Sequence, residues 1–203
     1  MKRLDILWRF LFLFILISCD SSKETDLGNS YFAQGDYKSA IEQYEKTLQY
    51  DPGNLYALNR MADAQMKLGE ANKSIQTYKK ILEIDREDIH ANIALGEYFS
   101  NLNQYNISEN YLNSISNKRF ALSGCQSALI YYLHSVNAYN LKDYKLALKD
   151  INRSIKRNKL NPKLYYLRYK IFSALNDETL ANKDSLAAYT LGYRQIDQLN
   201  IQP

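Results

Sequence analysis

Small and large apolar residues recur along this chain at spacings that a helix places on one face. The first set pairs Gly28 with Tyr31 and then continues with Ala40, Tyr44 and Thr47. Residues three or four positions apart lie on the same side of an α-helix. The set therefore predicts two helices that face each other across a short turn between Tyr31 and Ala40.

The same set of positions returns after 34, 68, 107 and 141 residues, so the period is 34 with one five-residue insertion. The later copies are Ala62, Gln65, Ser74, Tyr78 and Ile81; Gly96, Phe99, Ser108, Leu112 and Ile115; Ser135, Ala138, Ala147, Ile151 and Ser154; and Tyr169, Phe172, Ala181, Ser185 and Ala188. Self-similarity at such a period is typical of repeat architectures, in which neighbouring units must stack to bury their apolar faces.

The predicted turn within each unit repeats in the same register. Its central position holds Gly35, Gly69, Asn103, Lys142 and Asn176. Gly and Asn suit a helix C-terminus because they tolerate a positive φ, and an acidic residue such as Asp36 suits the start of the next helix.

These spacings resemble the 34-residue tetratricopeptide repeat (TPR). The resemblance implies an all-α TPR solenoid of about five antiparallel helix pairs that form a right-handed superhelix. We place the repeats at 21–54, 55–88, 89–127, 128–161 and 162–193, with a lengthened linker or helix near Phe120 and a C-terminal cap or tail over 194–203. An unrelated helical bundle with chance spacing is the alternative.

The N-terminus carries a pattern of a different kind. Lys2 and Arg3 precede an apolar run over 10–17, which is shorter than the roughly twenty residues that span a bilayer. The run ends in Leu-Ile-Ser-Cys, which resembles the lipobox of bacterial lipoproteins. That resemblance implies a signal peptide over 1–18 and a lipidated tether over 19–24, with acyl chains on Cys19. An uncleaved membrane anchor with an incidental cysteine is the alternative.

A lipobox places the protein at the bacterial cell envelope, lipid-anchored and facing the periplasm or the cell surface. Asp20 does not decide between the inner and the outer membrane. The net charge of +4 falls to about +2 without residues 1–18, which is too small to indicate nucleic-acid binding. Two cysteines exclude a disulfide framework, and we expect Cys125 to be a small buried apolar residue.

In TPR proteins, the first helix of each pair lines a concave binding face. The resemblance therefore assigns the protein-binding groove to Tyr56, Asn59, Asp63, His90, Ile93, Glu97, Tyr132, Val136, Tyr139, Tyr166 and Lys170. The apolar run Tyr132, Val136 and Tyr139 favours docking of a partner segment, because exposed apolar area usually marks an interaction site. Two alternatives remain: the C-terminal cap or the linker near Phe120 covers the run, or the insertion shifts it into the core.

Residues for catalysis are few. The two histidines lie far apart, and we expect His90 to be solvated and His134 to pack between helices. No phosphate-binding loop, cysteine cluster or nucleophile elbow occurs, so we expect no enzyme, no metal and no cofactor. The prediction is an adaptor that binds a protein or peptide at the membrane and supports envelope assembly or secretion. The alternative is a structural module that forms homodimers without a peptide ligand.

Overall fold

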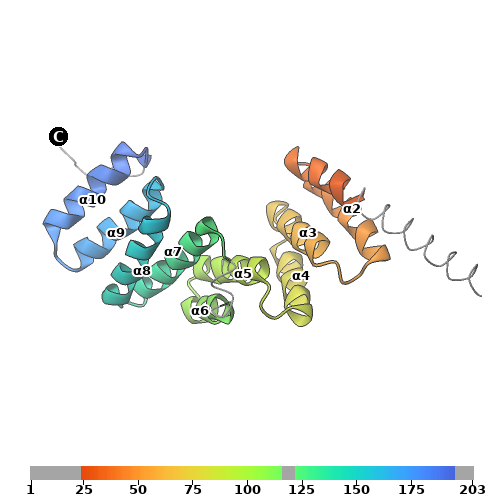
Figure 1. Ribbon diagram of the computed structural model, residues 1–203, viewed down its shortest axis with the longest axis horizontal. Coiled ribbons are helices and arrows are strands. Elements are labelled where there is room, and N and C mark those ends of the chain that lie inside the picture. The colour runs from red at the N-terminus through yellow and green to blue at the C-terminus, as the bar shows by residue number, and fades with distance from the viewer. Residues whose placement is uncertain (1–23, 116–121, 195–203) are drawn as a thin grey trace, which may run out of the picture. The chain divides into compact units, whose positions relative to one another are not determined.

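The computed structural model describes residues 24–115 and 122–194 (Figure 1). These residues contain helices and no strand, as the repeat pattern predicted. A helix covers residues 24–33, and the others are α2 (Tyr37–Tyr50), α3 (Leu55–Lys67), α4 (Ala71–Ile84), α5 (Ile89–Asn101), α6 (Tyr105–Ser114), α7 (Gly124–Asn140), α8 (Tyr144–Arg157), α9 (Pro162–Ala174) and α10 (Glu178–Thr190). The predicted signal peptide over 1–18 and the tail over 195–203 lie outside the described residues.

The chain divides into two compact units. The first ends at Ala91, and the second begins at Asn92. In the first unit α2 packs on α3, and α3 packs on α4. In the second unit α6 packs on α7, α7 on α8, α8 on α9, and α9 on α10. Within each helix pair, the two helices are antiparallel neighbours joined by a short turn. The right-handed superhelix of the whole chain stays a prediction.

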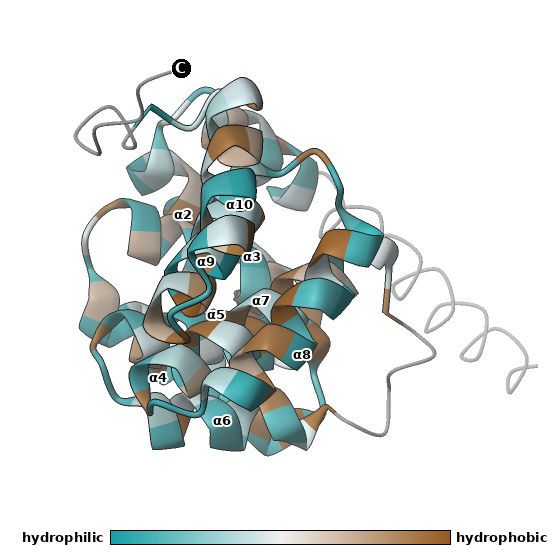
Figure 2. Ribbon diagram, turned by 90° about the vertical axis from the view of Figure 1, so that its left-hand side faces the viewer, coloured by the Kyte–Doolittle hydropathy of each residue, from teal (hydrophilic) through white to brown (hydrophobic). Residues whose placement is uncertain are grey.

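The positions that recur with the repeat form the core of both units. In the second helix of each pair, three of them are buried throughout: Ala40, Tyr44 and Thr47; Ser74, Tyr78 and Ile81; Ser108, Leu112 and Ile115; Ala147, Ile151 and Ser154; and Ala181, Ser185 and Ala188. Figure 2 shows hydrophobic and hydrophilic residues alternating along the helices, as expected when each helix buries one side. The positions that the repeat pattern aligns in these helices are therefore buried in every pair.

Small residues let the two helices of a pair approach closely, and hydroxyl groups join them. Ser74 donates a hydrogen bond to the carbonyl oxygen of Ala62 at 2.8 Å, and Ser108 donates to that of Gly96 at 2.7 Å. In the next pair the donor is on the first helix, where the Ser135 hydroxyl donates to the carbonyl oxygen of Ala147 at 2.8 Å. A buried hydroxyl needs such a partner, so each serine strengthens the contact that its small size permits.

The turns have the conformation that the sequence predicted. Their central positions all have positive φ: Gly35 81°, Gly69 87°, Asn103 60°, Lys142 63° and Asn176 59°. Aspartates then cap the following helices, since Asp36, Asp143 and Asp177 accept hydrogen bonds from backbone amides of the first turn.

The insertion before the fourth pair is absorbed partly by a longer helix. α7 has 17 residues, against 13 in α5, and begins at Gly124 rather than at the expected boundary of 128. Ser123 and Gln126 form a capping box that fixes this start. Cys125 lies in the first turn and is exposed, so the prediction that it is buried is wrong. Burial along α7 begins only at Ala128.

Candidate protein-binding surfaces

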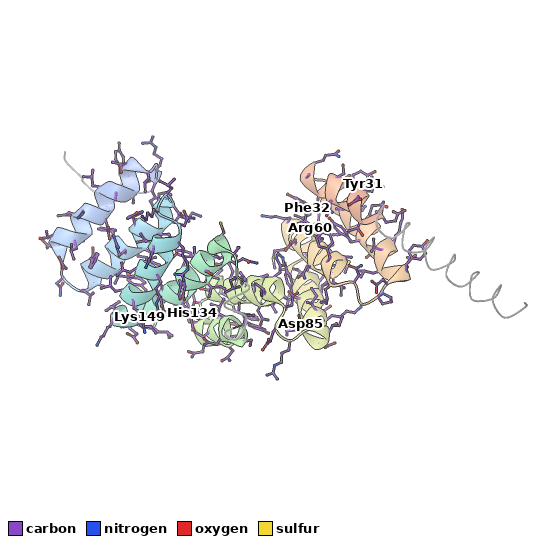
Figure 3. The ribbon with its side chains drawn as sticks, in the orientation of Figure 1. Tyr31, Phe32, Arg60, Asp85, His134 and Lys149 are labelled. Atoms are coloured by element: carbon purple, nitrogen blue, oxygen red, sulfur yellow. The ribbon has the colours of Figure 1, made fainter. Side chains whose placement is uncertain are left out.

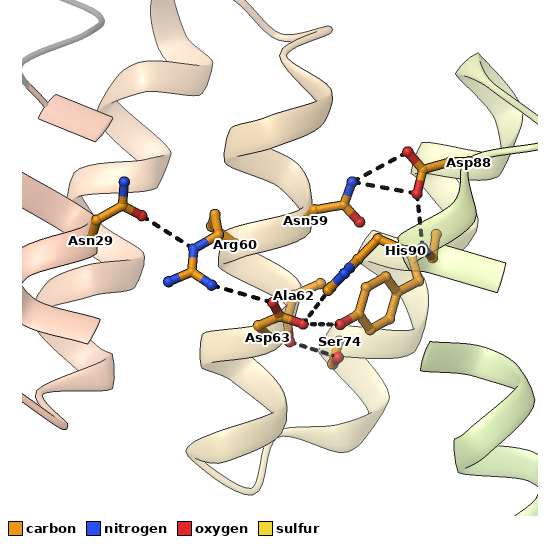
Figure 4. Close-up of polar contacts among 10 residues, drawn as sticks. Asn29, Asn59, Arg60, Ala62, Asp63, Ser74, Asp88 and His90 are labelled. Atoms are coloured by element: carbon orange, nitrogen blue, oxygen red, sulfur yellow. Dashed lines mark hydrogen bonds and ion pairs between the residues drawn. The ribbon is translucent and has the colours of Figure 1, made fainter. Parts of the chain in front are cut away.

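Four of the predicted groove residues meet on one side of the first unit. Tyr56, Asn59 and Asp63 follow one another along α3, and His90 reaches them from the start of α5. His90 Nε2 lies 2.8 Å from Asp63 Oδ1, as Figure 4 shows. The same carboxylate accepts a hydrogen bond from the Tyr78 hydroxyl of α4. Asp63 therefore joins three helices of the unit.

The Asp63 carboxylate remains ionised to low pH. Burial by itself would raise its pKa, but the hydrogen bonds from His90 and Tyr78 and the charges of His90 and Arg60 outweigh burial and lower it. The hydrogen bond to Asp63 raises the pKa of His90, although burial opposes this shift. His90 is half exposed, so the expected solvation is confirmed, but its ring also has a fixed partner.

Arg60 extends this polar network toward the N-terminus (Figures 3 and 4). Its Nε donates to Asn29 Oδ1 at 3.1 Å, and its guanidinium lies 4.2 Å from the centre of the Phe32 ring. The Tyr44 hydroxyl donates to the same Asn29 oxygen at 2.9 Å, and the Asn29 amide donates to the Tyr56 hydroxyl at 3.0 Å. The side chains of this face are thus held in place before any partner binds.

Asn59 lies beside this face, and its side-chain oxygen is buried. Its Nδ2 lies 3.4 and 3.5 Å from the Asp88 oxygens, and Asp88 Oδ1 also accepts from the Ala91 amide at 2.8 Å. The Oδ1 atom of Asn59 is buried and has no hydrogen-bond partner among the described residues. The partly exposed Asp63 carboxylate gives this face an acceptor with negative charge, which favours hydrogen-bond donors and cations over carboxylates.

The His90–Asp63 pair predicts a pH-dependent stability. The stability that the folded state gains from the raised pKa of His90 is fully present below pH 6.5. It is lost as the pH rises through the pKa of His90 in the folded state. The contribution of Asp63 is present above pH 3.8 and is lost as the pH falls through its lowered pKa. Urea unfolding followed by circular dichroism measures the free energy of unfolding of wild type and of His90→Gln. The difference between the two proteins should be about 0.5 kcal/mol larger at pH 5.5 than at pH 9, with wild type the more stable, since the ring is half exposed. An equal difference at both pH values would contradict this.

Tyrosines of α7, α9 and the segment after α10 gather with one lysine in the second unit. Tyr139 of α7 lies under Lys170 of α9, with Nζ 4.8 Å from the ring centre. Tyr166 of α9 contacts Tyr193, with ring centres 4.5 Å apart. Burial raises the pKa values of Tyr132, Tyr139 and Tyr193. We call these five residues the tyrosine surface.

The structure bears on the alternatives for the predicted apolar run, except for cover by the linker near Phe120, which lies outside the described residues. Tyr132, Val136 and Tyr139 are partly buried and pack against a core cluster formed by α7, α8 and α9. They are therefore neither fully open nor core residues. Tyr193 lies beyond α10 and covers Tyr166, so the C-terminal segment reaches this face. The chain turns there at Gly192, whose φ is 93°, and the Tyr193 amide donates to the carbonyl oxygen of Ala188.

Sequence reasoning missed a second polar network, centred on Asn137. Its Oδ1 accepts from the Ser100 hydroxyl at 2.7 Å, and its Nδ2 lies 2.9 Å from Ser108 Oγ and 2.8 Å from Glu109 Oε1. Glu109 also binds His134 Nδ1 at 2.8 Å. His134 is 14% exposed, which confirms its expected place between helices. Nothing in the repeat pattern distinguished Asn137 from an ordinary helix residue.

A small cavity lies beside His134 in the second unit. It has a volume of about 70 Å³ and opens between α6, the start of α7 and the end of α8. Its lining is polar and apolar in about equal parts and consists of Leu112, Ile115, Leu122, Ser127, Ile130, Tyr131, His134 and Arg157. Typical small-molecule sites enclose several hundred Å³, so this cavity is too small for an ordinary cofactor.

The profile of the tetratricopeptide repeat family matches residues 31–119. Solved structures extend the likeness beyond this region. MamA from Desulfovibrio magneticus RS-1 is 12% identical over 90% of this chain and 98% of its own, with a TM-score of 0.72. PilF of Pseudomonas aeruginosa is 16% identical over 87% of this chain and 78% of its own, with a TM-score of 0.76. TTC0263, a thermophilic TPR protein of Thermus thermophilus, is 15% identical over 87% of this chain and 94% of its own, with a TM-score of 0.63.

The fold is that of a tetratricopeptide repeat protein. TPR proteins are generally scaffolds that bind other proteins, and the matching family indicates no enzyme. Among the described residues, no group of three or more His, Cys, Asp or Glu side chains could hold a metal ion. In the same part of the chain, no helix is long and apolar enough to cross a membrane.

The TPR groove positions differ in how much surface they offer. Tyr56 is 55% exposed, and Glu97 is also exposed. Ile93 is only 8% exposed and belongs to the core, against the expectation of an open face. It lies one turn before Glu97 on α5, so exposure changes within one turn of this helix. Binding of a partner by the remaining positions stays a prediction.

Proposed function

We propose that this chain is a lipid-anchored TPR adaptor that binds a protein or peptide at the bacterial cell envelope. The tyrosine surface carries the proposal, because Lys170 of α9 lies over the Tyr139 ring of α7, and Tyr166 is one turn before Lys170 on α9. Partly buried aromatic residues are fixed by the core and still present ring edges and hydroxyls to a partner, which is how interface anchors are built. Lys170 favours a partner with acidic or aromatic groups.

The polar face of the first unit would add specificity rather than affinity. The Asp63 carboxylate is partly exposed and accepts hydrogen bonds. A basic residue or a backbone N–H donor of a partner would bind there. This chemistry disfavours a partner that presents only carboxylates to α3.

Loss of the tyrosine surface should weaken capture of the partner. We expect Tyr166→Ala and Lys170→Glu each to lower its recovery from detergent extracts of the envelope about tenfold, the usual effect of removing an interface anchor. Tyr50→Ala is the matched control, because Tyr50 is 54% exposed at the end of α2 and outside the predicted groove. Thermal unfolding of each variant checks its fold. Full recovery of every partner by folded Tyr166→Ala and Lys170→Glu would refute the surface.

Anchoring at the envelope is supported by the lipobox alone and is tested separately. Cys19→Ser should abolish incorporation of labelled fatty acid and release the protein from the membrane fraction, because the acyl chains supply the anchor. Cys125→Ser is the control, since Cys125 lies in the exposed first turn of α7. Fatty acid in the Cys19→Ser protein would contradict the assignment.

A further inference from the structure

The outward side of α8 carries lysines without acidic partners. Lys145, Lys149 and Lys156 are exposed, and their spacings of four and seven residues place them on one side of the helix. Figure 3 shows Lys149 projecting away from the ribbon. Among the described residues, no acidic side chain forms an ion pair with any of the three. Their charges are therefore directed at the solvent.

Acidic residues within this stretch do not neutralise the lysines. Asp143 caps α8 by accepting from the Leu146 amide at 3.0 Å. Asp150 is only 6% exposed and binds Arg153 at 3.0 Å. Both carboxylates are thus engaged elsewhere. Two further exposed lysines, Lys142 and Lys159, flank the helix and extend the positive side.

The positive charge is a property of the second unit and not of the whole chain. Residues 92–194 contain fourteen lysines and arginines and seven acidic residues. Residues 24–91 contain eight lysines and arginines and twelve acidic residues. A protein of nearly neutral total charge therefore presents one strongly basic helix, which the net charge conceals.

Apolar side chains accompany the lysines. Leu160, in the turn that follows α8, is 78% exposed, and Leu146 in the first turn is 42% exposed. Lysine is a hydrated point charge on a flexible stem and lacks the forked geometry with which arginine grips a single carboxylate. Lysines combined with exposed leucines suit an anionic lipid surface, where headgroups are mobile and an apolar layer lies just beneath.

We propose that the lysine side of α8 docks on anionic phospholipids through Lys145, Lys149 and Lys156, with Leu160 entering the headgroup layer. The inference rests on the proposed function for the anchor that keeps the chain near a bilayer. It adds an orientation: α8 is the second helix of its pair, so the tyrosine surface on α7 and α9 stays free for a partner. Each lysine near such a surface strengthens partitioning about fivefold.

The test compares lysine reactivity on neutral and anionic membranes. The full chain is placed in vesicles of phosphatidylcholine alone or with about 30% phosphatidylglycerol, and reductive dimethylation of each lysine is followed by mass spectrometry. Labelling of Lys145, Lys149 and Lys156 should slow about threefold or more on the anionic vesicles and recover at about 0.5 M salt, which screens the attraction. Lys79 and Lys80 are exposed on α4 and should react equally on both.

Each outcome decides the proposal. Equal labelling of the three lysines on both membranes would overturn it. Protection that is already present on neutral vesicles and grows with protein concentration would also overturn it, because it would identify an acidic protein surface, such as a second copy of this chain, as the occupant. Dissociation of the chain from neutral vesicles would contradict the proposed lipid anchor but not the docking of α8. Slower labelling of the three lysines on anionic vesicles would still support docking.

A variant assigns the effect to the three lysines. In the triple variant Lys145→Gln, Lys149→Gln and Lys156→Gln, the labelling rates of Lys142 and Lys159 on anionic vesicles should return to their values on neutral vesicles. The pair Lys79→Gln and Lys80→Gln is the control and should change nothing. All five positions are exposed, so the fold should be retained. Persistent protection of Lys142 and Lys159 in the triple variant would overturn the assignment.

Discussion

Arg168→Met should lower the free energy of unfolding of the second unit by about 3–5 kcal/mol, because it strands a buried charge. Arg168 Nε and Nη2 lie 2.6 and 2.7 Å from the two oxygens of Asp184, which is 3% exposed. Its Nη1 also donates to Asn152 Oδ1 at 2.7 Å, so this side chain joins α8, α9 and α10. Urea unfolding monitored by circular dichroism measures the loss.

Two controls separate the stranded charge from the loss of an ion pair as such. Lys73→Met removes the exposed pair with Glu70, whose atoms are 3.0 Å apart, and should cost less than about 1 kcal/mol. The double variant Arg168→Met with Asp184→Leu removes both charges and should recover most of the stability, since an apolar pair of similar volume is tolerated in such positions. A double variant no more stable than Arg168→Met would show that desolvation is not the cause.

The 34-residue period predicted the fold because it records local and repeated constraints. A close helix approach demands a small residue such as Ala62, and a tight turn demands a residue that tolerates positive φ, such as Gly69. Both demands recur along the chain and can be recognised without knowing the contacts, although the fifth pair has Tyr169 at the Ala62 position. Lys142 is the departure, since a lysine adopts a φ of 63° there. The neighbouring positions still fixed the register.

The pairings that tie helices together could not be predicted in the same way. Arg168 and Asp184 are 16 residues apart, and Ser100 and Asn137 are 37 apart, so only the packing brings them together. They do not recur from pair to pair, and a single sequence therefore contains no signal for them. The charge on α8 was hidden for a simpler reason: net charge averages the two units.

The candidate site was predicted to the level of a helix face. The resemblance placed Tyr56, Asn59 and Asp63 on the same face of α3, and Asp63 contacts His90, another predicted groove residue. Their role in binding stays a prediction. The resemblance also placed Ile93 in the groove, although packing buries that residue. A positional rule for a repeat specifies where a Cα lies, whereas exposure depends on what the neighbouring helix covers.

Gly96→Val should destabilise the second unit by about 2–3 kcal/mol through overpacking. A Cβ at this position would lie 2.7 Å from Leu112 Cδ2 and 2.8 Å from its Cγ. Leu112 is 2% exposed and cannot move away without displacing its own neighbours. Gly124→Val at the start of α7 is the control, because nothing lies within 4 Å of a Cβ there, and its unfolding midpoint should change little.

A double-mutant cycle would show that this contact is the cause. Leu112→Ala alone should cost about 2–5 kcal/mol by leaving a cavity beside Gly96. In the background of Gly96→Val, the added methyl groups would occupy part of that cavity. The double variant should therefore lose less stability than the sum of the two single losses, by at least about 1 kcal/mol. Additive losses would mean that α5 and α6 adjust around the valine, and that a small residue at Gly96 is not what allows the two helices to approach.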